Sequence, residues 1–533
     1  MIGVVYISFL IIIFVLKSYV NYITIFHEKG DIMLICGAQL YNPVTMHYDN
    51  FDVRIQKNTI SDLQPWEQST PEENETILPL HGAFLYPGFI DSHCHLMGTG
   101  EKYLSPSLLG IRSEQTLKQI LQNQLCLQQS IVLRGWDEEK LGFVPNRHFL
   151  DALPLEYPVV LVRKCGHIAT VNTVAVQLLH LYTLDGIDGT SIKEGVVRET
   201  ALVKMKKMLP QNVSLESNYI VEGAKRFLRH GVTSVHSEDW NPSRLECFFQ
   251  SNPLHIPCRL FEKVSIQNIE ELTYWIQHKS EIQHKIASSF IHTDRMIKIY
   301  MDGSVCGETA YLSTPYLKSH QNGVCYHSVE TLRQMILLAN QNNLQVCIHT
   351  IGDKALENVL KSFAANPFSF LRHRIIHAQF ASRKQILDIQ DKQLELSIQP
   401  CFYRADLETV TKILDPFYLQ DNGYPFKSYV EHDLLFSLST DSPVESENPF
   451  HNIAYAEEFM SRKKAFYAYT VAGARQVFQE KVLGMIAVGY TADFFVLNKD
   501  LFKMTKKELV STIPNKVFLD GKEMIGDIHA KTI

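Results

Sequence analysis

The chain has 533 residues, more than one compact domain holds, so we expect a large core and at least one smaller domain. Apolar residues make up 45% and charged residues 20%, which is ordinary for a soluble globular protein, and the net charge of −6 argues against nucleic acid as a partner. Ten scattered cysteines, no two closer than eleven positions, exclude CxxC motifs and favour reduced thiols in a reducing compartment.

The amino terminus is largely apolar from Ile2 to Leu16. A membrane span needs about 20 apolar residues, and counting on to Phe26 reaches this length only by including Lys17 and other polar residues. We expect residues 1–32 to lie outside the catalytic fold, either because the native chain starts at Met33 or because residues 2–26 are an anchor. The predicted location is cytoplasmic, with a membrane-anchored protein as the alternative.

Short alternating runs between about Met33 and Leu80, separated by polar turns, predict small β-strands. The carboxyl end repeats this character at 492–498 and 516–525, on either side of a short helical stretch. We therefore expect residues 33–82 and 480–533 to build one composite β-sandwich from both chain ends.

The stretch YPGFIDSHCHLMGTG, residues 86–100, places His93 and His95 on either side of Cys94, directly after an apolar run. Residues two apart in a strand point to the same side, so the two imidazoles project together and offer two nitrogen ligands for a metal. The alternative is that this HxH pattern arises by chance. A buried histidine is usually satisfied by a hydrogen bond to a backbone carbonyl.

Lys298 lies in RMIKIYMDGS, a predicted strand of apolar residues with one lysine. A charged lysine inside a barrel costs several kcal/mol unless it is paired or neutralised. One interpretation is a salt bridge with Asp302 or Glu308. The other is that the amine is carboxylated and becomes an anion that bridges two metal ions, since a buried lysine can react while neutral.

Strand and helix alternate after residue 328. Ser328 is a predicted N-cap, and apolar residues from Leu332 to Ala339 recur at i, i+3, i+4 and i+7. A second helix with this spacing follows at 356–363, and Ser382 with Gln385 forms a predicted capping box for a third. Three successive β/α units predict a parallel sheet with right-handed crossovers.

Either a doubly wound sheet or a (β/α)₈ barrel fits that alternation. His349, His377 and Asp441 each end a predicted strand, and in a barrel those carboxyl ends converge on one mouth. No Gly-x-Gly-x-x-Gly turn supports the dinucleotide-binding alternative. We therefore predict a TIM-type barrel over residues 83–479, although a hinge histidine, a packed imidazole and a helix N-cap remain the alternatives for these three residues.

Taken together, these segments resemble the metal-dependent amidohydrolase superfamily, in its YtcJ-like branch that includes N-substituted formamide deformylase. The resemblance runs from about Met33 to near residue 525 and includes PGFIDSHCHL, IKIYMDGSVCGETAYL, IHTIGDKALENVL, RIIHAQF and STDSPVESENPF. It implies a metal site formed by His93, His95, Lys298, His349, His377 and Asp441. The chain departs from the branch at Cys165 and Ile376, where acidic residues are usual, and this puts the substrate in doubt.

The resemblance also implies a mechanism. Two divalent ions, expected to be Zn²⁺, would activate a bridging hydroxide, and a CO₂-derived carbamate on Lys298 would link them. Asp441 would act as general base and then general acid in the cleavage of a non-peptide amide or formamide bond. Two alternatives stay open: a mononuclear amine deaminase of the same superfamily, and a catalytically inactive barrel scaffold.

The 203 positions between His95 and Lys298 exceed plain β/α units, so we expect an inserted subdomain, about 103–215, to cap the mouth. From it Trp136, His167 and Glu199 are candidate substrate contacts, with packing as the equal alternative. The expected partner is a small amide-type substrate. A homodimer is left open, and membrane contact is expected only if residues 1–32 form an anchor.

Overall fold

The computed structural model describes residues 32–124, 131–154, 156–164, 168–209, 212–251, 254–286, 288–363 and 368–526. The chain divides into two units. The first takes in the described residues of Met1–His95, Lys225–Cys247 and His255–Ile533, and the second those of Leu96–Ala224 and Phe248–Leu254.

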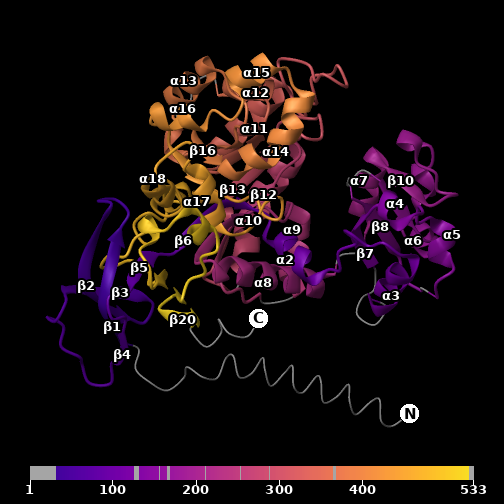
Figure 1. Ribbon diagram of the computed structural model, residues 1–533. Coiled ribbons are helices and arrows are strands. Elements are labelled where there is room, and N and C mark those ends of the chain that lie inside the picture. The colour runs from indigo at the N-terminus through magenta and orange to yellow at the C-terminus, as the bar shows by residue number, and fades with distance from the viewer. Residues whose placement is uncertain are drawn as a thin grey trace, which may run out of the picture. The chain divides into compact units, whose positions relative to one another are not determined.

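Eight parallel strands form the central sheet of the first unit (Figure 1). Asp441 N donates to His93 O at 2.9 Å and Ser92 Oγ donates to Leu438 O at 3.0 Å, so the two edge strands meet and the barrel is nearly closed. The predicted barrel is thus confirmed. In sheet order the strands are β6 (Phe89–Cys94), β11 (Val232–Ser237), β12 (Arg259–Ser265), β13 (Ile291–Tyr300), β14 (Gln345–Thr350), β15 (Arg374–His377), β16 (Glu395–Ile398) and β17 (Phe436–Leu438).

Helices connect these strands, and their ends follow the sequence signals. Ser328 caps α11 by accepting from Thr331 N, and Ser382 with Gln385 forms the predicted capping box of α13. The helices are α8 (Val213–Arg229), α9 (Pro242–Ser251), α10 (Ile269–Lys285), α11 (Val329–Gln341), α12 (Asp353–Ser362), α13 (Arg383–Asp391), α14 (Pro400–Ile413), α15 (Pro416–Asn422), α16 (Phe426–Glu431), α17 (Pro449–Ala456), α18 (Arg462–Ala468) and α19 (Val471–Gln476).

Both chain ends contribute to a second sheet in this unit. β5 (Phe84–Pro87) pairs antiparallel with β18 (Phe494–Leu497), so the indigo amino-terminal strands lie beside the yellow carboxyl-terminal chain in Figure 1. Arg259, at the start of β12, donates to Asp493 at 2.7 Å and so ties the barrel to this sheet. The other strands are β1 (Ile32–Asn42), β2 (His47–Gln56), β3 (Thr59–Pro65), β4 (Thr76–Pro79), β19 (Lys516–Leu519) and β20 (Lys522–Ile525), and α20 (Lys506–Val510) lies between β18 and β19.

The second unit contains a four-stranded sheet in the order β10-β9-β8-β7. Its boundaries lie near those expected for the inserted subdomain, and the expectation that it caps the barrel mouth stays a prediction. Its elements are α2 (Leu96–Leu104), α3 (Glu114–Gln124), β7 (Ile131–Trp136), α4 (Glu138–Leu141), α5 (Arg147–Asp151), β8 (Val159–Arg163), β9 (Ile168–Val171), α6 (Thr173–Leu178), β10 (Val196–Arg198) and α7 (Glu199–Met208).

Two features bear on the expected surroundings of the protein. Within the described ranges, no helix combines the length and the apolar character that crossing a bilayer requires. The proposed anchor, residues 2–26, lies outside those ranges. The eight cysteines in the described part of the chain are free thiols.

Candidate metal site

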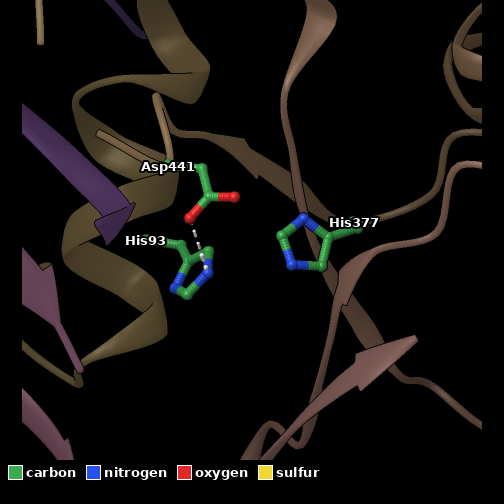
Figure 2. A group of neighbouring side chains, drawn as sticks. All are labelled: His93, His377 and Asp441. Atoms are coloured by element: carbon green, nitrogen blue, oxygen red, sulfur yellow. Dashed lines mark ion pairs between the residues drawn. The ribbon is translucent and has the colours of Figure 1, made fainter. Parts of the chain in front are cut away.

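His93 and His95, at the end of the first barrel strand, lie close to Asp441, which follows the last barrel strand. His93 lies on β6 and His95 directly follows it, so both imidazoles point to the same side. Their Nε2 atoms each lie 3.3 Å from Asp441 Oδ1. Figure 2 shows this carboxylate above the ring of His93, with the ring of His377 across the gap. Three groups that lie far apart in the sequence therefore meet at one end of the barrel.

Backbone geometry fixes Asp441 and His377. Thr440 donates its N–H and its hydroxyl to Asp91 Oδ2 at 3.0 and 2.7 Å, which holds the end of β17 against β6. Asp441 and His377 have φ values of 55° and 77°. Such left-handed conformations cost about 1–3 kcal/mol each in non-glycine residues and cluster at functional sites.

His349 and His377 form a second pair of imidazoles. Their ring centroids lie 4.6 Å apart, and the ring of His377 lies 5.2 Å from that of His93. His377 Nδ1 lies 2.9 Å from Gln399 Oε1, and His349 Nε2 lies 3.1 Å from Gly303 O. Each ring therefore has one nitrogen held by a fixed oxygen, which orients the other nitrogen.

Lys298 is fully buried on β13 and pairs with Glu238, which directly follows β11. Asp302 and Glu308, the partners in the salt-bridge interpretation, do not form this pair. Asp302 lies beyond the end of β13 at Tyr300. Asp302 instead accepts from the backbone N–H groups of Tyr311, Ile351 and Gly352 at 2.8–3.0 Å.

Burial and charge keep most of the imidazoles neutral. Burial, with the nearby Lys298 charge, lowers the pKa of His349 to about 3 and holds the pKa of His93 well below its usual range. Burial and the neighbouring His349 do the same to the pKa of His377. Neutral imidazole is the form that binds metal.

At His95 and Glu238, by contrast, neighbouring charges favour the charged form of the side chain. Burial lowers the pKa of His95, but the adjacent Asp441 carboxylate outweighs it and raises that pKa to about 9. Burial raises the pKa of Glu238, and the Lys298 charge outweighs that contribution and lowers it. The Glu238 carboxylate therefore stays anionic at neutral pH within reach of the histidines.

These residues fit a divalent cation. Ligand atoms of His93, His377 and Asp441 lie within 4.8 Å of one another, and so do those of His93, His95 and Glu238. His93 is only 1% exposed, and its Nδ1 is a buried atom with no hydrogen-bond partner among the described residues. Mixed imidazole and carboxylate donors suit zinc and similar ions.

The candidate substrate residues fall in the stretch of chain assigned to the second unit, Leu96–Ala224. Trp136 is buried at the end of β7, and its indole N–H donates to Leu161 O at 2.8 Å, which matches the packing alternative. His167 lies outside the described residues, and Glu199 begins α7 with its side chain outside them. Their roles in substrate binding stay predictions.

The site contains one residue that sequence reasoning missed. Glu238 follows β11 in VTSVHSED. The rule that singled out His349, His377 and Asp441, a polar side chain at the carboxyl end of a barrel strand, applies equally to it. That strand contains His236 but no pair of histidines like His93 and His95, and neither His236 nor Glu238 was predicted as a ligand.

A nearly closed parallel barrel with histidines and carboxylates at the carboxyl ends of its strands defines a metal-dependent hydrolase. Residues 77–525 match the amidohydrolase family, and the chain belongs to that family.

Relatives and solved structures agree with this assignment. YtcJ of Bacillus subtilis (strain 168), named as an amidohydrolase, is 29% identical over 497 residues, covering 85% of this chain and 90% of its own. LONG AFTER FAR-RED 3 of Arabidopsis thaliana is 25% identical, covering 84% of this chain and 83% of its own. A crystal structure of an uncharacterized metal-dependent hydrolase from Pyrococcus furiosus has the same fold, with a TM-score of 0.76 and 24% identity over 89% of this chain and 100% of the other.

Proposed function

We propose that this hydrolase cleaves a carbon–nitrogen bond in a small non-peptide amide or formamide, using two zinc ions held by His93, His95, Lys298, His349, His377 and Asp441. The position of Asp441 carries the proposal. Its Oδ1 lies 3.3 Å from Nε2 of both His93 and His95, so it is next to any cation that these imidazoles bind. The name of the YtcJ relative supports the same class of bond.

When bound, the cations would polarise the substrate carbonyl and lower the pKa of a coordinated water toward about 7. Asp441 would take a proton from the attacking water and pass it to the leaving nitrogen, so that the amine would depart neutral. His93, His349 and His377 keep neutral rings because they are buried. Gln399 Oε1 accepts from His377 Nδ1, which leaves Nε2 of that ring as the ligand atom.

Lys298 would contribute as a carbamate formed with CO₂. Two observations support this role. Lys298 is buried on β13, and its Nζ lies 4.3 Å from the ring centroid of Tyr300, which in turn lies 4.9 Å from that of His349. A carbamate would carry a negative charge to the side of the site that His349 and His377 form.

A substrate screen tests the proposal. Zinc-loaded protein in bicarbonate buffer is incubated with formamides and acylated amines, and the products are measured by mass spectrometry. We expect a carboxylic acid or formate together with an amine, and no product from chelator-treated protein. Ammonia released from an exocyclic amine, with one zinc per chain, would indicate the deaminase instead. Protein that binds no zinc and turns over nothing would be the inactive scaffold.

A further inference from the structure

Glu238 is a buried carboxylate of the site that the predicted ligand set does not use. Its side chain is 4% exposed and that of Lys298 is 0% exposed, and the two form an ion pair. Its ligand atom also lies within 4.8 Å of those of His93 and His95. Glu238 therefore lies close to Lys298 and to both histidines.

The backbone holds Glu238 in this position. Glu238 N donates to Cys94 O at 3.1 Å, and Glu238 O lies 3.0 Å from His95 Nδ1. These contacts join the end of β11 to the end of β6. Because these contacts hold the backbone of Glu238, its carboxylate needs little rearrangement to become a ligand of the cation that His93 and His95 would hold.

We infer that Glu238 is itself a metal ligand, which completes with His93 and His95 a site for a first divalent cation that does not need a carbamate on Lys298. The inference rests on the proposed metal-dependent function and deepens it. In this arrangement Lys298 as an ammonium neutralises part of the carboxylate charge, and the second cation joins only after the lysine has lost a proton and reacted with CO₂.

Charge counting over the six predicted ligands and Glu238 supports two states. With Lys298 as an ammonium and the imidazoles neutral in the metal-bound form, Glu238 and Asp441 leave a net charge of −1, and one divalent cation brings the total to +1. Carboxylation forms a bond between the lysine nitrogen and the carbon of CO₂ and releases protons from that nitrogen, so one positive charge becomes one negative charge. The set then carries three negative charges, and two divalent cations bring the total to +1, the same net charge as before. The metal count thus follows the chemical state of Lys298.

Zinc binding by variants tests this inference. The variants are K298M, which cannot be carboxylated, the double variant E238Q/K298M, and the matched control D239N/K298M, which removes one carboxylate at the next position. Chelator-treated protein is titrated with zinc alone, and zinc per chain is measured by mass spectrometry of the metal. We expect about one zinc for K298M and for the control, and affinity weaker by more than about 10-fold for E238Q/K298M.

A second experiment uses the wild-type protein. It does not require the folding of K298M, in which the buried Glu238 loses its lysine partner. The wild-type protein should bind about one zinc per chain in CO₂-depleted buffer and about two in bicarbonate, with a rise in the unfolding temperature at each step. Equal zinc affinity of K298M and E238Q/K298M would overturn the inference. So would wild-type protein that binds no zinc without bicarbonate.

The two proposals fail in different ways. If zinc binding depends on Glu238 and no amide or formamide is hydrolysed, the proposed reaction fails and the ligand assignment stands. If amides are hydrolysed and E238Q/K298M binds zinc as K298M does, the assignment fails alone.

Discussion

Replacement of Gln399 by leucine should weaken metal binding without removing any ligand. Gln399 is fully buried, and its Oε1 is the partner of His377 Nδ1 at 2.9 Å. Loss of such a partner leaves the ring free to turn and makes Nε2 a poorer ligand, which typically costs about 10- to 100-fold in metal affinity. This corresponds to about 1.4–2.7 kcal/mol. Gln399 Nε2 also donates to Ser439 Oγ at 2.7 Å, so we expect Q399L to lose about 1–3 kcal/mol of folding stability as well.

The matched variant Q399E separates the two effects, because a glutamate keeps an acceptor for His377 Nδ1. Zinc affinity is measured by competition with a chromophoric chelator, and stability by urea unfolding of chelator-treated protein. We expect Q399E to bind zinc at least as tightly as wild type and Q399L to bind it more weakly. Wild-type affinity for Q399L would refute the reasoning, because His377 would then not depend on its hydrogen bond for ligation.

Three further predictions follow from the same structure. Asp441→Asn should fold and retain zinc but lose about 100-fold or more of the turnover number, since the amide cannot accept the proton; near wild-type kinetics would exclude Asp441 as the base. Arg259→Met should cost about 3–5 kcal/mol in urea unfolding, because the buried Asp493 loses its partner; a loss below about 1 kcal/mol would show that this pair does not tie the barrel to the sheet. Burial lowers the pKa of His373 from about 6.5 to about 4, so between these pH values the unfolded chain binds a proton that the folded chain does not. Stability should therefore fall by up to about 3 kcal/mol from pH 6.5 to pH 4, measured by urea unfolding, and H373N should show a shallower fall; an equal slope would contradict this assignment.

Much of the barrel could be predicted because its periodic signals are local. The capping residues Ser328 and Ser382 and the apolar face from Leu332 to Ala339 are set by neighbours within one or two helical turns, and the structure keeps them. The histidines and Asp441 were found for a related reason, since strand ends can be read from short apolar runs.

Side-chain contacts between different strands could not be predicted from the sequence. Nothing near Lys298 in the chain indicates that its partner is Glu238, sixty positions earlier, because that pairing depends on how β11 and β13 lie in the closed barrel. The positive φ of His377 and Asp441 could not be predicted either, because most histidines and aspartates have a negative φ even though both types are enriched among the exceptions.

Anomalous X-ray diffraction at the zinc edge, on crystals of the zinc-loaded protein grown in bicarbonate, would locate the cations. We expect two peaks at the carboxyl ends of the barrel strands, one about 2 Å from the ligand atoms of His93 and His95 and the other equally close to those of His349 and His377. Anomalous density elsewhere, or none at the mouth of a zinc-loaded barrel, would contradict this expectation.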